Sequence, residues 1–386
     1  MRSRGEIDAA GGLVRPRIVL VIGGLQAGGA ERQLADLANY WATHDCAVTL
    51  ATWTGPENAD FYDLAPGIRR IHLEGGPPAS SALGRVRRLG AQVRALRRLL
   101  RTSSPDAVLS FIDVSNVLTI VAALGLGLRV GVSERTSPAV NRNVTGVWRL
   151  LRKGFYRCAS IVIAQTRDAA SWLDRTCAVR AVVIPNALRN LPVIRQPRET
   201  LIIAVGRLSH EKGFDLLLRA FHRLQHEFPD WRVAILGEGP DRQRLSELCD
   251  ELGLASRVSV AGEVRDVEAW MARAGLLVHP SRREGFPNAV LEAMGMGVAV
   301  ICADCHSGPA DLIQDGVNGR LVPVDDLQAL TEAMRQLMAS PDLRDRLGRE
   351  ATQVREGYAQ PRILGLWEAA LFPDQLRSDV RSRALH

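Results

Sequence analysis

The sequence predicts an α/β protein with two βα domains in tandem. Short apolar runs alternate with longer amphipathic runs along most of its 386 residues. The short runs are apolar throughout, which is typical of parallel strands covered by helices on both faces. This rhythm pauses once, at residues 182–200, where three prolines and two asparagines indicate a linker. A chain of this length is also expected to form two domains.

The first half of the chain supplies an N-terminal domain, predicted at residues 17–188 after a disordered tail at 1–16. The run RIVLVIGGL (17–25) is a buried strand ending in glycines, and GAERQLADLANYWATH (29–44) has the spacing of an amphipathic helix. Further strands follow, with helices between them: 47–53, 107–111, 128–134 and 160–166.

The pattern restarts after a linker at residues 189–199. A C-terminal domain is predicted at 200–360, with a long helix at KGFDLLLRAFHRLQHEF (212–228). Its strands are 201–206, 231–237, 257–262, 275–280 and 297–302. Both domains are therefore Rossmann-like, and an interdomain cleft is expected, since ligands of such sheets bind beyond the carboxyl ends of the strands. The last helix, PRILGLWEAALF (361–372), is apolar on one face, and the segment 361–375 is predicted to pack back on the first domain.

Composition excludes several classes of protein. With 46% hydrophobic and 24% charged residues, the chain has an ordinary globular composition, and its six scattered cysteines suggest no disulfide framework. We expect a cytoplasmic location, because no signal peptide and no run of about 18 apolar residues is evident. The stretch CADCH (302–306) matches the attachment signature of a c-type haem, but such a haem is attached after export. We therefore interpret Cys302 as a small hydrophobe that ends a buried strand.

Charge is unevenly distributed along the chain. Residues 1–195 hold 26 Lys and Arg against 14 Asp and Glu, whereas the rest is acidic overall, and the total is +7. A basic half suggests an anionic partner such as a membrane surface, a phosphorylated lipid or nucleic acid. Only Lys153 and Lys212 are lysines, so each one is of interest.

The segment GRLSHEKG (206–213) follows a predicted strand and opens a helix. Arg207 and Lys212 therefore lie near a helix N-terminus, where free N–H groups and the dipole favour an anion. An arginine fork and a lysine charge five residues apart suit a diphosphate. Two solvated loop charges are the alternative interpretation.

The segment EGFPNAVLEA (284–293) contains two carboxylates. Glu284 lies in a loop and Glu292 lies eight residues later in a helix, so both can face one cleft. Carboxylates accept hydrogen bonds from hydroxyls, which makes a sugar ring and a ribose natural ligands. The turn into this helix is formed by Phe286, Pro287, Asn288 and Ala289, and the first N–H groups of the helix are expected to be free for phosphate. The alternative is a solvated loop glutamate beside an ordinary helix glutamate.

These segments occur together with others in a familiar order. The series is GGAER (28–32), VSER (132–135), IPN (184–186), GRLSHEKG (206–213), ILGEGP (235–240), EGFPNAVLEA (284–293) and DCHSGPADLIQDGVNGRLVP (304–323). The sequence thus resembles the GT-B retaining glycosyltransferases of family 4 over residues 17–372. The resemblance implies that Arg207 and Lys212 hold the donor diphosphate, that Glu284 hydrogen-bonds the transferred sugar, and that Glu292 takes the nucleotide ribose.

The resemblance also implies contacts from other segments. The backbone around Val264 and Arg265 would flank the base. Gly28 and Gly29 would approach the phosphates from the other domain, because a Cβ atom would block close approach.

The sequence departs from the family pattern in one place. Many relatives carry a histidine in an N-domain loop near the reacting sugar, but no histidine falls between residues 73 and 209. The segment SERTSP (133–138) stands where that loop is expected. Glu134 and Arg135 are therefore the acceptor-side candidates, with Asp113 behind them, although each could be a strand-end salt-bridge partner.

The run LGRVRRLGAQVRALRRLLR (83–101) contains seven arginines and no acid. A core-facing stripe is predicted at Val86, Leu89, Val93, Leu96 and Leu100. Another face gathers Arg87, Arg94, Arg98 and Arg101. This face is either solvated or binds anionic lipid headgroups or a lipid-linked diphosphate. The segment VWRLLRKGFYR (147–157) has aromatics beside cations, as an interfacial helix would. Together with the arginine face, it favours peripheral association with the inner face of the membrane. No nucleic-acid partner is expected.

The predicted function is transfer of a hexose or N-acetylhexosamine from a UDP- or GDP-sugar to a hydroxyl of a lipid-linked or polysaccharide acceptor, with retention. No nucleophile stands out opposite the sugar, so same-face attack is expected. No metal-ligand cluster is evident and the family typically needs none, so no cofactor is expected. Alternatives are an epimerase on the same scaffold and a non-catalytic nucleotide-sugar-binding subunit. An NAD oxidoreductase is disfavoured, because GGLQAGG does not fit G-x-G-x-x-G.

Overall fold

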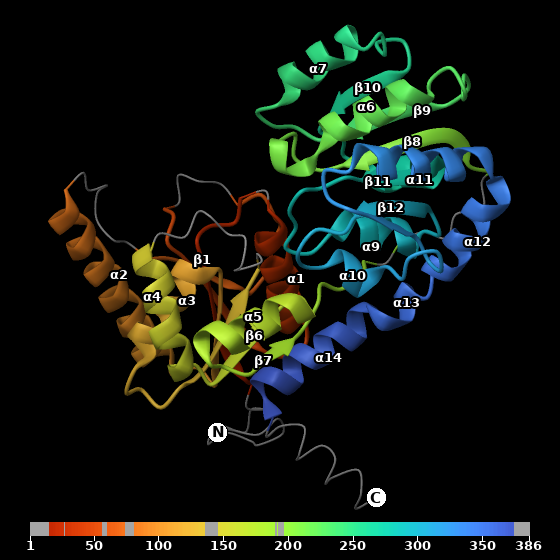
Figure 1. The fold of residues 1–386 in the computed structure, drawn as a ribbon. Coiled ribbons are helices and arrows are strands. Elements are labelled where there is room, and N and C mark those ends of the chain that lie inside the picture. Colours follow the sequence, from red (N-terminus) through yellow and green to blue (C-terminus); the bar gives the residue numbers. More distant parts are fainter. Residues whose placement is uncertain are drawn as a thin grey trace, which may run out of the picture. The chain divides into compact units, whose positions relative to one another are not determined.

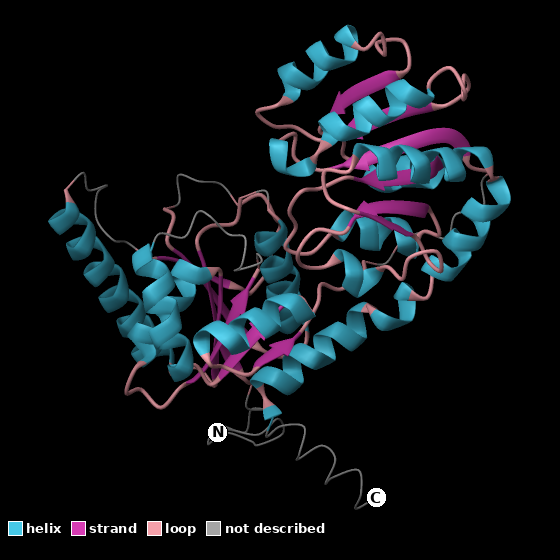
Figure 2. Cartoon of the chain, in the orientation of Figure 1, coloured by secondary structure: helices cyan, strands magenta, loops and turns pink. Residues whose placement is uncertain are grey.

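The computed structural model describes residues 15–26, 28–55, 60–73, 81–135, 146–189, 191 and 197–373. The chain forms two compact units (Figure 1). The first unit comprises the residues up to Ile184 together with those from Leu364 onward, and the second unit runs from Pro185 to Ile363. Each unit is a parallel sheet covered by helices (Figure 2). The predicted fold class, α/β with two Rossmann-like domains in tandem, is confirmed. The tail at 1–14 and most of the predicted linker lie outside the described residues.

The first unit contains a seven-stranded sheet in the order β3-β2-β1-β4-β5-β6-β7. Its strands are β1 (Arg17–Ile22), β2 (Ala47–Thr52), β3 (Arg69–His72), β4 (Ala107–Phe111), β5 (Arg129–Glu134), β6 (Ile161–Ala164) and β7 (Ala181–Val183). The sequence did not predict β3 and β7. Both are short edge strands without a buried residue, so neither has the continuous apolar run that marks a central strand.

Helices of the first unit connect these strands. They are α1 (Gly29–Thr43), α2 (Ala82–Ser103), α3 (Asp113–Ala123), α4 (Gly146–Phe155), the 3₁₀ turn η1 (Tyr156–Cys158) and α5 (Arg167–Cys177). Two of these helices, α2 and α5, have a side-chain N-cap. The Ser81 hydroxyl accepts a hydrogen bond from the N–H of Gly84, and the Thr166 hydroxyl accepts one from the N–H of Ala169.

The predicted core-facing stripe of α2 is only half correct. Leu96 and Leu100 are buried, whereas Val86 is 65% exposed and Leu89 is half-buried. The reason is that α2 is 22 residues long and its buried side chains all lie from Gln92 onward, so its first turns are not part of the core that the described residues form.

The last helix, α14 (Gln360–Leu371), supplies core residues to the first unit. Trp367 is fully buried and its ring lies 5.7 Å from that of Phe111. The Arg129 guanidinium donates to the carbonyl oxygen of Ala370 at 2.9 Å. The end of the described chain therefore completes a domain begun about 350 residues earlier.

The second unit contains a six-stranded sheet in the order β10-β9-β8-β11-β12-β13. Its strands are β8 (Glu199–Val205), β9 (Arg232–Leu236), β10 (Val258–Gly262), β11 (Ala274–His279), β12 (Ala299–Ala303) and β13 (Arg320–Val322). Its helices are η2 (His210–Lys212), α6 (Phe214–Leu224), α7 (Arg242–Glu251), α8 (Val267–Arg273), α9 (Asn288–Gly295), α10 (Pro309–Leu312), α11 (Leu327–Ala339), α12 (Pro341–Ala351) and α13 (Val354–Gly357). Ile202 and Ile203 of β8 belong to core clusters on opposite faces of this sheet.

The helix predicted at 212–228 is shorter in the structure, because α6 begins at Phe214 and ends at Leu224. Lys212 lies in the 3₁₀ turn η2, and Gly213, at φ +67°, separates that turn from α6. Among the residues that the structure describes, no helix combines the length and the apolar character that a bilayer crossing requires.

Candidate active site in the second unit

Two loops follow neighbouring strands of the second sheet. Residues 206–213 follow β8, and residues 280–287 follow β11, which pairs with β8 in parallel. Because parallel strands end at the same edge of a sheet, the loops that carry Lys212 and Glu284 meet there.

The two loops pack backbone against backbone. A Cβ atom on Gly213 would lie 2.2 Å from the carbonyl oxygen of Pro280, and the positive φ of Gly213 is one that L-residues rarely adopt. The N–H of Arg282 donates to the carbonyl oxygen of Glu211 at 2.7 Å. Glycine at 213 is therefore what lets the Lys212 loop approach the Glu284 loop.

Arg282 fastens the same junction with its side chain. Its guanidinium donates to the carbonyl oxygen of His210 at 2.7 Å, and to both carboxylate oxygens of Asp215 at 2.8 and 3.0 Å. It also donates to Asp325 at 2.6 Å. Burial alone would raise the pKa of Asp215, but Arg282 more than offsets this and lowers it. Arg282 is thus a structural clamp between the two loops.

Lys212, Glu284 and His279 form the polar centre of this edge. Lys212 Nζ donates to Glu284 Oε1 at 2.5 Å, and His279 Nε2 lies 2.6 Å from the same oxygen. The side chains of Glu284 and His279 are 8% and 3% exposed, and that of Lys212 is 22% exposed. Burial would raise the pKa of Glu284, but Lys212 and His279 outweigh it and hold this pKa at about 2. Glu284 is therefore a carboxylate, which can accept but not donate a hydrogen bond.

Other residues predicted for the donor belong to the same unit. Arg207 is exposed on the Lys212 loop, directly after β8. Val264 and Arg265 follow β10, the strand at the edge of the sheet, and Arg265 is exposed. Glu292 is half-buried within α9.

The turn into α9 is firmly held. Phe286 is buried and Pro287 precedes the helix. The side-chain oxygen of Asn288, at the first position of α9, accepts a hydrogen bond from the Asn186 amide at 2.7 Å. Ala289 is half-buried one residue further on.

The loop after β12 joins the site as a third segment. A Cβ atom on Gly308, at φ +106°, would lie 2.7 Å from Pro287. Cys302 and Cys305 are buried free thiols, and burial raises the pKa of Cys302 well above its usual range and that of Cys305 to about 12. Unreactive, buried thiols agree with a packing role for CADCH.

The first unit brings Glu134 into a buried network. The Tyr156 hydroxyl donates to Glu134 Oε1 at 2.5 Å, Arg152 donates to the same oxygen at 3.4 Å, and Asn116 donates to the Tyr156 oxygen at 2.9 Å. The Arg152 guanidinium also lies 4.8 Å from the Trp172 ring. Glu134 therefore ties α4 and η1 to the end of β5, the salt-bridge alternative that the sequence had left open.

Arg135 and Asp113 are also buried at this edge of the first sheet. Burial lowers the pKa of Arg135 to about 9, and its guanidinium lies 4.8 Å from the Phe111 ring. Asp113 Oδ1 accepts from the N–H of Val114, whereas its Oδ2 is buried without a hydrogen-bond partner in the described parts of the chain. Ile112, just before it, has φ +73°, a strained value for a β-branched residue.

Gly28 caps the N-terminus of α1, and Gly29 is the first residue of that helix. The Tyr62 hydroxyl accepts from the Gly28 N–H at 3.1 Å and donates to its carbonyl oxygen at 2.9 Å. Residue 27 lies outside the described residues.

Two protein-family models match this chain. The family model for glycosyl transferases group 1 matches residues 192–354, and that for Glycosyltransferase Family 4 matches residues 27–189. The chain is a family 4 glycosyltransferase. Each match corresponds to one structural unit, although strand β1, most of α13 and the final helix lie outside both matches.

Individual relatives of this glycosyltransferase come from several bacteria. An N-acetylgalactosaminyltransferase of Campylobacter jejuni, named for a diphosphoundecaprenol-linked acceptor, is 27% identical over 91% of this chain and 97% of its own. An amylovoran biosynthesis glycosyltransferase of Erwinia amylovora is 24% identical over 92% and 99%. An exopolysaccharide phosphotransferase of Streptomyces coelicolor is 31% identical over 75% of this chain, which spans only 31% of that longer protein.

Solved structures show the same GT-B fold. Sucrose-phosphate synthase from Thermosynechococcus elongatus has a TM-score of 0.80 at 20% identity, over 94% of this chain and all of that one. HepE of Anabaena, solved with UDP and glucose, has a TM-score of 0.75 at 19% identity, over 92% and 98%.

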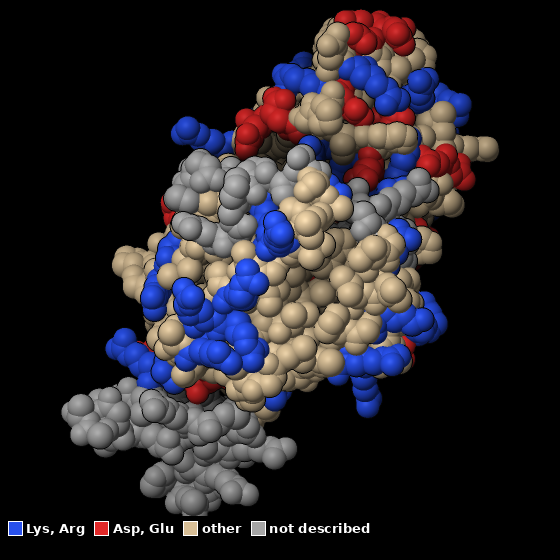
Figure 3. All heavy atoms as spheres, turned by 90° about the vertical axis from the view of Figure 1, so that its left-hand side faces the viewer, with Lys and Arg blue, Asp and Glu red and all other residues tan. Residues whose placement is uncertain are grey.

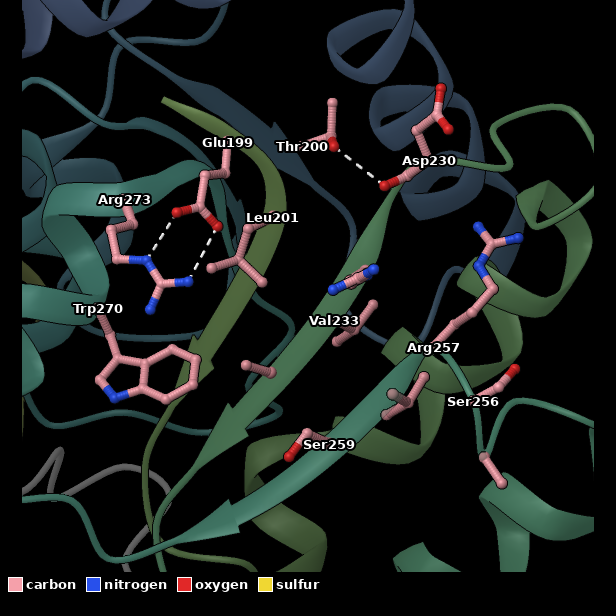
Figure 4. Close-up of a pocket in the computed structure, with 14 residues that line it drawn as sticks. Glu199, Thr200, Leu201, Asp230, Val233, Ser256, Arg257, Ser259, Trp270 and Arg273 are labelled. Carbon is pink, nitrogen blue, oxygen red and sulfur yellow. Dashed lines mark hydrogen bonds and ion pairs between the residues drawn. The ribbon is translucent and has the colours of Figure 1, made fainter. Parts of the chain in front are cut away.

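A pocket of about 700 Å³ lies elsewhere in the second unit of this glycosyltransferase (Figure 4). It is formed at the amino ends of β8, β9 and β10, the edge of the sheet opposite to Lys212 and Glu284. Its Arg273 pairs with Glu199, and its Arg257 donates to carbonyl oxygens, including that of Trp231. The predicted donor residues take no part in it.

Several residues of the site escaped the sequence analysis. His279 and Arg282 lie within five residues of Glu284, and a polar residue at the end of an apolar strand was the available signal for His279. Arg152 and Tyr156 fall in the run 147–157, whose cations and aromatics were interpreted as interfacial. Both are in fact buried, which corrects that interpretation for these two residues.

Proposed function

We propose that this glycosyltransferase moves a hexose or N-acetylhexosamine from a UDP- or GDP-sugar to a hydroxyl of a lipid-linked or polysaccharide acceptor, with retention of anomeric configuration. The observation that carries the proposal is the pairing of Lys212 with Glu284 at the carboxyl edge of the second sheet. It places a cation suited to a diphosphate beside a carboxylate suited to a sugar hydroxyl.

The donor would engage both groups at once. Lys212 and the exposed Arg207 would stabilise the negative charge that develops on the diphosphate as it leaves, which is an electrostatic form of catalysis. Glu284 Oε2 has no hydrogen-bond partner among the described residues, so it is available to a sugar hydroxyl. Glu292 would take the ribose, and Val264 and Arg265 would flank the base.

We propose that retention proceeds without a covalent intermediate on Glu284. A carboxylate with a pKa of about 2 is a weak base, which favours a hydrogen-bonding role over nucleophilic attack on the sugar. We therefore favour attack of the acceptor on the face that the diphosphate leaves. NMR of the product would report the anomeric configuration, and an inverted linkage would reject this part of the proposal.

We also propose that transfer needs no metal ion, because Arg207 and Lys212 supply positive charge where a metal would otherwise act. No cluster of metal-ligating side chains occurs in the part of the chain that the structure describes. Transfer should continue at an unchanged rate in excess EDTA, and a rate restored by added Mg²⁺ or Mn²⁺ would contradict this.

The test of the function is a product assay with a panel of UDP- and GDP-sugars and with lipid-linked and polysaccharide acceptors. Release of nucleoside diphosphate and a lengthened glycan, both only with acceptor present, is the expected result. Lys212→Met and Glu284→Gln should each lower kcat by at least about 100-fold, and Arg232→Met, at the opposite edge of the sheet, should not. A converted sugar nucleotide without acceptor would indicate epimerisation, and binding without turnover would indicate a non-catalytic subunit.

A membrane-bound acceptor is supported by one face of the first unit. Arg87, Arg94, Arg98 and Arg101 of α2 are exposed, and Lys and Arg gather over this side of the unit (Figure 3). Of the nine large hydrophobic side chains exposed in the described residues, four lie in the first turns of α2 and α4: Leu83, Val86, Val147 and Leu150. Helices that carry both exposed apolar side chains and exposed cations suit an anionic bilayer surface, so we propose peripheral membrane association.

Liposome co-sedimentation tests the membrane proposal. Binding should require anionic lipid and be lost when the four α2 arginines are replaced by glutamate. The matched control replaces four exposed arginines of the second unit by glutamate: Arg219, Arg223, Arg232 and Arg349. Equal binding to neutral and anionic vesicles, or equal loss in both variants, would reject the proposal.

A further inference from the structure

Glu284, the group assigned to the donor sugar, is held by a residue that no motif contains. We propose that His279 is a positioning residue: it fixes Oε1 of Glu284, so that Oε2 remains available to a hydroxyl of the transferred sugar when Lys212 engages the diphosphate. This inference rests on the proposed function and identifies what orients its central carboxylate.

His279 sits on a rigid platform. It is the last residue of β11, a strand buried along its whole length between β8 and β12, and it pairs in register with Cys302. Glu284, in contrast, lies in the loop after the strand. The bond of 2.6 Å between His279 Nε2 and Glu284 Oε1 therefore ties a loop carboxylate to the end of a central strand.

The direction of this hydrogen bond is fixed by chemistry. A carboxylate only accepts, so Nε2 carries the proton. His279 Nδ1 is buried and has no hydrogen-bond partner among the described residues. Leaving a buried ring nitrogen unpaired is unfavourable, and leucine would fill the position without that cost. The bond to Glu284 is the contact that offsets it.

Lys212 alone cannot keep the Glu284 carboxylate oriented. Lys212 and His279 share Oε1, but the lysine is a flexible, partly exposed cation that the proposed function moves to the donor phosphates. His279 is 3% exposed and lies on the strand, so it keeps its bond when Lys212 leaves. The carboxylate then stays oriented at the moment the sugar binds.

The experiment compares two ligands by calorimetry, the nucleotide sugar preferred by the wild-type enzyme and its nucleoside diphosphate. His279→Leu should weaken binding of the nucleotide sugar and lower kcat/KM by about 10- to 100-fold, the effect of losing one hydrogen bond to a charged group. Affinity for the nucleoside diphosphate should not change, because Arg207 and Lys212 remain. His279→Gln, whose amide can reach the same oxygen, should recover most of the loss.

Leu277→Ala, on the same buried strand, controls for simple damage to the core. The inference would be overturned if His279→Leu weakened the affinity for both ligands equally, or weakened neither at an unchanged melting temperature. It would also be overturned if a folded His279→Gln variant bound the nucleotide sugar no better than His279→Leu does. If the wild type binds no nucleotide sugar of the panel, the proposed function itself fails and this inference fails with it.

Discussion

Glu284 shows how neighbours decide the state of a buried group. Its burial opposes ionisation, yet Lys212 and His279 keep it charged. The motif spacing predicted Glu284 and Lys212, because each follows a strand that ends at the same edge. It could not predict His279 or Arg282 as their partners, since these contacts depend on the path of an irregular loop.

The low pKa of Glu284 makes a prediction about stability and pH. Its folded-state pKa of about 2 lies below its ordinary value of 4.5, so the carboxylate contributes stability that is fully present above pH 4.5 and is lost as the pH falls toward 2. The difference in free energy of unfolding between wild type and Glu284→Gln should shrink across that window. Urea titrations between pH 6 and 2.5 measure it, and a constant difference would contradict the assignment.

The first unit offers a contrast between two acidic residues. Glu134→Gln should destabilise the protein by about 3 kcal/mol, because it leaves the Arg152 guanidinium buried without its carboxylate. Asp113→Asn keeps the oxygen that caps Val114, so it should leave stability unchanged but lower kcat at least about 10-fold if Oδ2 serves the acceptor. Thermal unfolding and initial rates on both variants separate the two roles. If Asp113→Asn destabilised the protein and Glu134→Gln lowered only kcat, the structural role would belong to Asp113 and the functional role to Glu134.

At the scale of elements, the site depends on how closely three loops pack. The central strands and the helices that alternate with them were predictable, because buried parallel strands are apolar throughout. The strands β3, β7 and β13 were not, since a strand of three or four residues at the edge of a sheet leaves no such run. Likewise α6 begins two residues late because Gly213 breaks the helix, a conformation that the sequence alone did not reveal.

Two glycines with nearly the same backbone conformation test this packing. Gly213 and Gly253 have φ +67° and +68°, but a Cβ atom would meet the Pro280 carbonyl at Gly213 and nothing at Gly253. Gly253→Ala should cost about 1 kcal/mol, the penalty of the left-handed conformation. Gly213→Ala should cost clearly more and also lower kcat/KM, because the Lys212 loop must move. Equal stability and activity in both variants would show that the loops are not packed as described.

At the scale of the whole molecule, the chain builds two sheets and then returns to the first. The apolar face of the last helix was visible in the sequence, but its partner residues come from strands more than 200 positions earlier. Trp367→Ala should therefore destabilise the first unit by about 3 to 5 kcal/mol. Leu366→Ala, at a position 40% exposed, is the matched control and should change stability by less than about 1 kcal/mol. Urea unfolding followed by circular dichroism measures both, and similar effects would contradict the packing of α14.

The most direct test of the central claim is a calorimetric titration of three proteins with a nucleoside diphosphate and with its sugar conjugate. The account predicts that Lys212→Met weakens binding of both ligands, because it removes a phosphate contact. Glu284→Gln should weaken only the sugar conjugate. If either variant binds both ligands as the wild type does, the donor is not held by these two residues and the account is wrong.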